Sequence, residues 1–247
     1  MTLEEGSQDG RNRMDIMEVL SMTISQAGKN TESRKDGATS SATDRFYEAW
    51  KEDADALRAK RAERLRKESN LGIRFSRRTF DSFDASKDRD AYQKCLNYAD
   101  HYNDSERNCL LIVGGYGTGK THLAASIANR LMDNGIPVLF DTFSGHLNKL
   151  KLEFNGGKSV YLEQMKQTDM LILDDIGKEK QSEWSQSIMF DVINHRYEHM
   201  LPIVMTTNLN SEGLKDYLGG AVWSRLCEMC SGVQTKGSDY RQNADQT

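Results

Sequence analysis

After residue 72, short apolar runs alternate along the chain with longer stretches of helical periodicity. This pattern predicts an α/β fold with a sheet between helices, and connections of this length favour parallel strands with right-handed crossovers. The five predicted strands cover residues 109–113, 138–141, 170–173, 203–206 and, with a weaker pattern, 232–235. The helices predicted between them cover residues 121–133, 144–154, 161–166, 183–199 and 212–217.

The first 70 residues have a different pattern. Residues 14–22 form a short apolar segment that is too small to fold alone and that could be a helix offered to a partner. Residues 26–44 are rich in Ser, Thr and Gly and contain no large apolar side chain, which predicts a flexible linker. Residues 45–69 lack Gly and Pro and are dense in Ala, Glu, Lys and Arg, which predicts one long helix. We therefore expect two parts: a helical, partly flexible N-terminal region over residues 1–70 and an α/β domain over residues 71–247.

The first predicted strand runs directly into a glycine-rich turn that fits G-x-x-x-x-G-K-[ST], the pattern of a phosphate-binding loop. Glycines let the backbone aim N–H groups at phosphate oxygens, and the N-terminus of the next helix favours an anion. A glycine-rich turn that matched by chance would lack this strand and helix context. The lysine should reach the β- and γ-phosphates of ATP, and the threonine hydroxyl should bind Mg²⁺. The predicted nucleotide-binding residues are Gly114, Gly115, Gly117, Thr118, Gly119, Lys120 and Thr121.

A carboxylate pair ends the third predicted strand. Asp174 and Asp175 follow the apolar run, 54 positions after Lys120. Because the carboxyl ends of parallel strands share one edge of a sheet, both carboxylates can meet the phosphate-binding loop. Asp174 is expected to hold Mg²⁺ through water, and Asp175 to orient or deprotonate the attacking water. Two acids at the end of a buried strand are costly without compensating charge, which argues against a purely structural role.

The fourth predicted strand also ends in polar residues, Thr206, Thr207 and Asn208. Asn208 could hold the attacking water or the γ-phosphate. Thr and Asn often end strands as turn formers, but their place after two matching motifs favours a functional role. The three motifs together predict an enzyme that binds Mg·ATP and hydrolyses it.

The amino-acid composition limits the cellular compartments in which the protein is expected. The 247 residues include 37% hydrophobic positions, and no apolar run approaches the roughly 18 residues of a membrane span. The acidic, polar start is expected to be neither a secretion signal nor a transit peptide, and four cysteines fit a reducing compartment better than a disulfide framework. We expect a cytoplasmic protein without a membrane partner.

Charge is uneven along the chain although the net charge is only −4. Residues 58–78 carry nine basic and two acidic residues. This basic run is a candidate contact for a polyanion, and the alternative interpretation is a solvated helix face.

These motifs together resemble the additional-strand branch of P-loop ATPases, and specifically the DnaC and IstB family of AAA+ proteins. The resemblance covers roughly residues 71–247. Its motifs are "GGYGTGKTHLA", "LILDDIG" and "MTTNL", the lead-in "LGIRFSRRTFDSFD", the stretch "INHRYEHMLPIVMTTNL", and "WSRL" and "TKGSDYR" near the end. It implies an AAA+ core with a five-stranded parallel sheet and no helical lid, because only 126 residues follow Thr121.

By position in "WSRL", the resemblance implies that Arg225 is an arginine finger that reaches the ATP of a neighbouring subunit. Self-association through the ATP site would then be required for hydrolysis. The alternative is an ordinary surface or helix-capping arginine. Arg241 in "SDYR" also matches the family pattern but has no assigned role. Many AAA+ enzymes have glutamate where this chain has Asp175, and the shorter reach suits slow turnover.

The resemblance implies a DnaC-type loader that binds a replicative DNA helicase through the N-terminal region and single-stranded DNA through the AAA+ part, with slow ATP hydrolysis as a switch. An IstB-type transposition helper, which would act on duplex DNA and a transposase, is the main alternative. A P-loop kinase would need an arginine-bearing lid, whereas residues 134–169 contain no arginine. A nucleotide-dependent scaffold that does not hydrolyse ATP is a further alternative.

Two other patterns point to metal or redox chemistry. His195 and His199 fit H-x-x-E-H, a zinc protease pattern, but they share a helix face with apolar residues and we expect core or boundary histidines. Cys227 and Cys230 form C-x-x-C without a second pair, so we expect helix packing and not a metal or redox site.

Overall fold

The computed structural model describes residues 37–102, 104, 107–153 and 159–237. The apolar segment at residues 14–22, most of the predicted linker and Arg241 lie outside these ranges. The linker prediction was wrong for residues 37–44, because helix α2 spans Gly37–Glu68. Helix propensities of ordinary residues span only about 0.7 kcal/mol, so a helix can extend through a polar stretch that composition marks as a linker.

The contacts within the chain divide it inside α2, between Ala54 and Asp55. The sequence-based boundary at residue 70 lies instead beyond the end of this helix. Ala62 and Leu65 of α2 are buried, and Leu65 belongs to the core of the α/β unit. The α/β unit therefore includes the last turns of α2.

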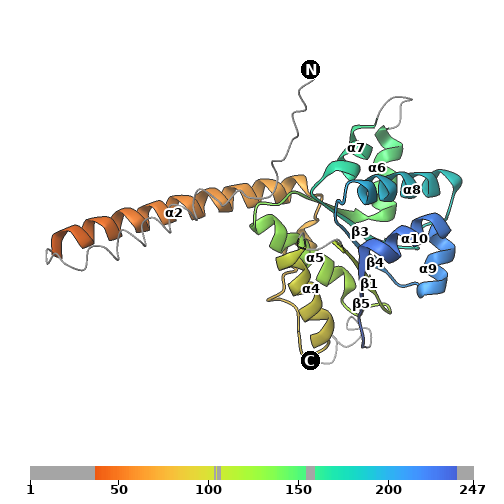
Figure 1. Cartoon of the computed structure of the whole chain (residues 1–247), viewed down its shortest axis with the longest axis horizontal. Helices are drawn as coiled ribbons and strands as arrows, with labels where there is room; N and C mark the ends of the chain where they lie inside the picture. Colours follow the sequence, from red (N-terminus) through yellow and green to blue (C-terminus); the bar gives the residue numbers. More distant parts are fainter. Residues whose placement is uncertain (1–36, 103, 105–106, 154–158, 238–247) are drawn as a thin grey trace, which may run out of the picture. The chain divides into compact units, whose positions relative to one another are not determined.

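The α/β unit is built on a five-stranded parallel sheet with the strand order β2-β3-β4-β1-β5 (Figure 1). The predicted fold class is confirmed, with all five strands close to their predicted positions. β4 lies between β1 and β3, so the three strands that carry the motifs are adjacent and end at the same edge. The strands are β1 Cys109–Val113, β2 Val138–Thr142, β3 Met170–Ile176, β4 Ile203–Thr207 and β5 Cys230–Gln234.

Helices cover both faces of the sheet because alternate strand residues point to opposite sides. Leu110 and Ile112 of β1 pack in the cluster that contains α4 and α5, whereas Leu171 and Leu173 of β3 pack in the cluster that contains α6 to α10. The helices are α3 Ile73–Ser76, α4 Arg89–His101, α5 Lys120–Asp133, α6 Phe143–Glu153, α7 Val160–Gln167, α8 Glu183–Glu198, α9 Ser211–Leu218 and α10 Gly220–Met229.

The predicted helices did not include α4, although its buried positions Ala91, Cys95, Tyr98 and Ala99 follow a helical period. α3 and α10 were also not predicted as separate helices. Within the described ranges, no helix is both long and apolar enough to cross a membrane, and no helix follows β5.

Candidate functional site

The phosphate-binding loop connects β1 to α5 and depends on glycine at two positions. Gly119 has a φ of 92°, and a Cβ added there would lie 2.9 Å from Cε2 of Phe83. A Cβ added at Gly114 would lie 2.0 Å from Oγ1 of Thr235. Any larger residue would therefore displace the segments that pack against the loop.

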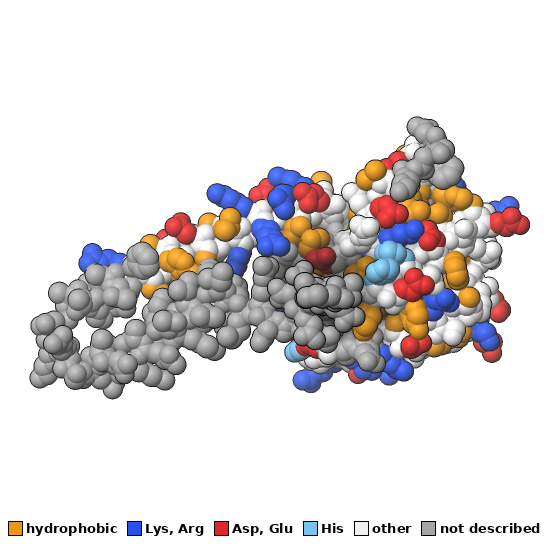
Figure 2. All heavy atoms as spheres, turned by 45° about the horizontal axis from the view of Figure 1, so that its top comes forward, with side chains coloured by type: hydrophobic (Ala, Val, Ile, Leu, Met, Phe, Trp, Pro, Cys, Tyr) orange, Lys and Arg blue, Asp and Glu red, His pale blue; other side chains and the backbone are white. Residues whose placement is uncertain are grey.

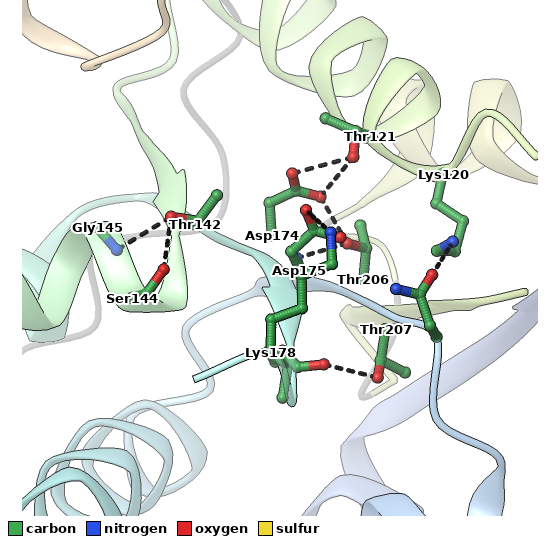
Figure 3. A network of polar contacts seen from close by, with 12 residues as sticks. Lys120, Thr121, Thr142, Ser144, Gly145, Asp174, Asp175, Lys178, Thr206 and Thr207 are labelled. Atoms are coloured by element: carbon green, nitrogen blue, oxygen red, sulfur yellow. Dashed lines mark hydrogen bonds and ion pairs between the residues drawn. The ribbon is translucent and has the colours of Figure 1, made fainter. Parts of the chain in front are cut away.

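Lys120 is the first residue of α5 and turns its ammonium group back over the loop. Its Nζ donates hydrogen bonds to the carbonyl oxygen of Gly115 and to Oδ1 of Asn208, each at 2.6 Å. Figure 3 shows Lys120 beside the carboxylates of β3. The side chain is buried, with 5% of its surface exposed. The structure thus brings together the lysine of the first motif and the asparagine of the third, as the sequence predicted.

Asp174 lies at the end of β3, directly below the start of α5. Both of its carboxylate oxygens lie 3.0 Å from the hydroxyl of Thr121, and Oδ1 also accepts a hydrogen bond of 2.5 Å from the hydroxyl of Thr206 (Figure 3). Burial raises the pKa of Asp174 above its ordinary value, although the hydrogen bond from Thr206 opposes this shift. Neither hydroxyl carries a positive charge to balance the carboxylate.

The adjacent carboxylate points elsewhere because the strand is irregular there. The β3–β4 register shifts between Leu173 and Ile176, and Asp175 has a φ of 57°. This left-handed conformation is unfavourable for most side chains, and such strain is often found at functional sites. Asp175 forms a 2.7 Å ion pair with Lys178, and its backbone N–H donates to the hydroxyl of Thr206. The two carboxylate groups therefore have different partners.

An open cavity of about 610 Å³ lies over this end of the sheet, within the size range of small-molecule sites. Lys120, Thr121, Asp175 and Asn208 line it together with Gly117 and Gly119. The remaining predicted residues of the loop and of β3 do not line the cavity. Gly114 and Gly115 shape the loop, Asp174 is 2% exposed beneath Thr121, and Thr118 hydrogen-bonds Thr235 through their hydroxyls at 2.7 Å.

The other residues that line the cavity were not predicted individually. They come from the lead-in segment before α4 and from residues around the loop: Arg74, Phe75, Arg78, Ser82, Phe83, Asp84, Lys87, Tyr116, His122 and Lys178. Phe83 packs between Tyr92 and His122, with ring centroids 5.9 and 5.1 Å away. Burial lowers the pKa of His122, with a smaller contribution from the positive charge of Arg78. The resemblance of "LGIRFSRRTFDSFD" to the family lead-in was the one signal for this wall.

The donor set suits a magnesium nucleotide. Asp174 and Thr121 present oxygen atoms, the ligand type that Mg²⁺ prefers, and the buried carboxylate gains from a cation because its hydroxyl partners are neutral. Lys120 and the N-terminus of α5 suit phosphate oxygens. The apolar and aromatic rings of Phe75 and Phe83 suit the nucleoside end of the same ligand.

Arg225 is not part of this cavity. It lies on α10, where its guanidinium carbon is 5.4 and 5.6 Å from the ring centroids of Phe190 and Tyr197 and Nη1 donates to the carbonyl of Ala221 at 3.0 Å. Its Nε is buried without a hydrogen-bond partner among the described residues. The structure therefore places this arginine on a separate surface of the same chain.

The histidine and cysteine patterns lie on α8 and at the junction of α10 with β5. His195 and His199 stack on α8 with centroids 4.1 Å apart, and His199 is exposed at the end of the helix. The described residues contain no cluster of three or more His, Cys, Asp or Glu side chains suited to a metal ion. Cys227 is exposed near the end of α10, and Cys230 begins β5 opposite Cys109 of β1.

Comparison with known proteins gives a consistent family match. A family model described as "IstB-like ATP binding protein" matches residues 16–247. Phage-like element PBSX protein XkdC of Bacillus subtilis (strain 168) is 34% identical over 166 residues, which are 63% of this chain and 62% of that protein. The chain thus spans less than two thirds of this relative's length.

Two further matches carry the name of a helicase loader. Replicative helicase loader DnaC of Escherichia coli (strain K12) is 28% identical over 192 residues, which are 72% of this chain and 78% of that protein. A crystal structure of the DnaC helicase loader superposes with a TM-score of 0.60 at 27% identity, covering 67% of this chain and all of that one.

Proposed function

Because the chain belongs to the family of IstB-like ATP binding proteins, we propose that it is a cytoplasmic, DnaC-like ATPase that loads a replicative DNA helicase onto single-stranded DNA. The description of the family model gives ATP binding as the general activity of this family. The observation that carries the proposal is the convergence of Lys120, Thr121, Asp175 and Asn208 on one cavity of about 610 Å³.

The nucleotide is held by groups that already face the cavity. Lys120 exchanges its bonds to Gly115 and Asn208 for bonds to the β- and γ-phosphates, and loop N–H groups bind the remaining phosphate oxygens. Thr121 and Asp174 hold Mg²⁺, which neutralises phosphate charge when it is bound. Thr206 keeps the Asp174 carboxylate in place through its 2.5 Å hydrogen bond.

Hydrolysis of the γ-phosphate uses Asp175 and Asn208. Asp175 orients the attacking water or accepts its proton, and Lys178 positions this carboxylate through their 2.7 Å ion pair. Asn208 is released when Lys120 turns to phosphate, so its amide is then available for the water or the γ-phosphate. The short reach of Asp175 favours slow turnover, which suits a switch.

A second copy of the chain completes the site. Arg225 lies outside the cavity of its own chain, so it can act only on the ATP of a neighbour. It must leave the rings of Phe190 and Tyr197 to do so, and this requirement links hydrolysis to assembly.

Arg225→Ala tests this role. The variant should bind ATP with the affinity of the wild type, whereas turnover under assembling conditions should fall by about 1,000-fold. The matched control is Arg130→Ala, which removes an arginine of α5 that forms an ion pair with Asp100 of α4. Equal turnover of Arg225→Ala and the wild type, measured as phosphate release at high protein concentration, would remove the finger role.

The partners follow from the relatives. DnaC is named a replicative helicase loader, so we propose that residues 1–70 bind the helicase and that the α/β unit contacts single-stranded DNA. The name of the family model keeps one alternative open, an IstB-like helper that acts on duplex DNA with a transposase. ATP turnover stimulated by duplex DNA, together with failure to bind a replicative helicase, would favour that alternative.

A further inference from the structure

The basic run at residues 58–78 divides into two parts that differ in how their charges are compensated. Four of the six basic residues of the run that lie on α2 form ion pairs, and Figure 2 shows Lys and Arg side chains next to Asp and Glu side chains along this helix. Arg74, Arg77 and Arg78 come after α2 has ended, and among the described residues their guanidinium groups form no hydrogen bond or ion pair. The ion-paired bases of α2 are Arg58, Arg64, Arg66 and Lys67.

The three arginines surround a hollow. A cavity of about 500 Å³ is lined by Ile73, Arg74, Arg77 and Arg78. Arg74 and Arg77 are exposed and Arg78 is partly buried, while 79% of the Ile73 surface is exposed. The hollow therefore combines three uncompensated positive charges with an apolar side chain that nothing in the described structure covers.

The backbone that carries these side chains is fixed to the α/β unit. The buried amide of Asn129 on α5 donates hydrogen bonds to the carbonyls of Phe75 and Arg78, at 3.0 and 2.9 Å. The hydroxyl of Ser82 donates to the carbonyl of Arg77 at 3.3 Å. Because the backbone is already ordered, binding a ligand here adds no cost for ordering this segment of backbone.

We propose that Arg74, Arg77 and Arg78 bind the phosphate backbone of single-stranded nucleic acid. A guanidinium presents a planar fork of donors that matches phosphate oxygens, and clustered uncompensated charge attracts a polyanion. A nucleic acid strand also offers sugar and base faces to the exposed Ile73, which a chain of carboxylates does not. Direct reading of a duplex requires an element that enters a groove, and the four residues of α3 are too short for that.

This inference deepens the proposed function, since it names the residues through which the α/β unit contacts DNA. Arg74 and Arg78 also line the nucleotide cavity, so ATP could change the affinity for a strand. The test is therefore made without nucleotide, on the full-length protein, and ATP binding is measured separately.

The experiment compares two triple variants with equal loss of charge. Arg74→Gln/Arg77→Gln/Arg78→Gln removes the uncompensated arginines, and Arg58→Gln/Arg64→Gln/Lys67→Gln removes three exposed, ion-paired bases of the same run. Fluorescence anisotropy with a labelled oligothymidylate gives the affinity over a salt series. The first variant should bind 10- to 100-fold more weakly, and its log–log salt slope should be about 2 smaller, since each single-strand phosphate contact contributes about 0.7. The second variant should stay within about twofold of the wild type because its charges are already compensated.

Two results would overturn the inference. Equal losses in both variants would mean that only net charge matters, and full affinity in the arginine variant would mean that the strand binds elsewhere. Poly-glutamate is titrated in parallel, and loss of its binding with oligothymidylate binding intact would assign the hollow to an acidic protein instead. Thermal unfolding checks that both variants are folded.

The outcome is separable from the proposed function. Failure of the wild type to bind ATP would defeat the proposed function while the strand measurement remained readable. Normal ATP binding with an arginine variant that keeps full affinity for the strand would defeat only this inference.

Discussion

Arg196 and Lys120 are both buried cations, but they have different kinds of partners. Arg196, with none of its surface exposed, donates hydrogen bonds to the backbone carbonyls of Met165, Lys166 and Pro202 at 3.0, 3.1 and 2.7 Å. Burial lowers the pKa of Arg196 to about 10, so it remains charged at neutral pH. Its guanidinium ties the end of α7 to the turn that leads from α8 to β4.

Lys120 also bonds to a carbonyl, but its second partner is a side chain and its ammonium group faces an open cavity. These partners can be exchanged for phosphate oxygens without disturbing a helix or a strand. The comparison indicates that a buried charge bonded only to backbone carbonyls supports the fold, whereas one bonded beside a cavity is available to a ligand. Predictions at each kind of site test this distinction.

The largest effect is expected at the ligand site. Lys120→Ala should reduce ATP affinity by about 1,000-fold, because a desolvated ammonium makes charge-assisted hydrogen bonds to phosphates. The melting temperature without nucleotide should change little, since the partners of this lysine, Gly115 and Asn208, lie outside the helices and strands. Isothermal titration with ATP and a thermal melt measure the two quantities on one sample. The control is Lys94→Ala, which removes an exposed lysine paired with Asp90 on α4. Normal ATP affinity in Lys120→Ala would contradict the assignment of the ATP site.

The reverse pattern is expected for the structural cation. Arg196→Met should lower the free energy of unfolding by about 3 to 5 kcal/mol, since two buried hydrogen bonds and one partly buried hydrogen bond to backbone carbonyls are lost. Urea unfolding of the full-length protein measures this loss. The same variant should bind ATP normally at a temperature where it is folded. A loss below about 1 kcal/mol would show that the distinction between the two cations is mistaken.

A smaller effect, confined to chemistry, is expected at the strained carboxylate. Asp175→Asn keeps a residue type that tolerates the positive φ of 57°, but it removes the base. Turnover should fall at least about 100-fold, the contribution of a positioned acid or base, with ATP affinity nearly unchanged. Single-turnover hydrolysis separates the two quantities. Turnover at the wild-type rate would exclude Asp175 from the reaction.

The smallest effect concerns a structural histidine and appears as a pH dependence. His146 is fully buried, with its ring nitrogens 2.8 Å from the hydroxyl of Tyr161 and 3.1 Å from the carbonyl of Ile172. Burial lowers its pKa from 6.5 to about 4. Between these values the unfolded chain takes up a proton that the folded chain excludes, so stability should fall as the pH falls from 6.5 toward 4. The loss is about 1.4 kcal/mol per pH unit and about 3 kcal/mol over the window.

Urea unfolding between pH 7 and pH 4 tests this sign by comparing the wild type with His146→Gln, which cannot titrate. His101→Gln removes an exposed histidine and serves as the control. The stability of His146→Gln should depend less steeply on pH, whereas that of His101→Gln should follow the wild type. Parallel curves for all three proteins would contradict the account of His146.

The sequence predicted what depends on local patterns. Short apolar runs gave the five strands, and the motif residues Lys120, Thr121, Asp174 and Asn208 lie together because parallel strands end at one edge. These motifs can be recognised in the sequence because binding a nucleotide restricts both the residue types and their spacing.

The remaining features depend on contacts between distant segments. The wall that includes Arg74 and Phe83 has no regular pattern, and Asn129 on α5 holds it in place. The structural role of Arg196 could not be predicted from the sequence either, since its partners are backbone carbonyls, which every residue has. Helix α4 was not predicted, although its buried residues recur with a helical period. The extension of α2 to Gly37 was not predicted either, because sequence patterns are a weak guide to where a helix begins.

The measurement that tests the central claim most directly is co-elution with the replicative helicase of the same cell, with and without Mg·ATP. Full-length protein is compared with a chain that lacks residues 1–54, because the α/β unit begins at Asp55 and retains the buried Ala62 and Leu65 of α2. The account predicts a complex with the full-length protein that is lost with the shortened chain. No complex under either condition, with ATP turnover stimulated by duplex DNA instead, would contradict it.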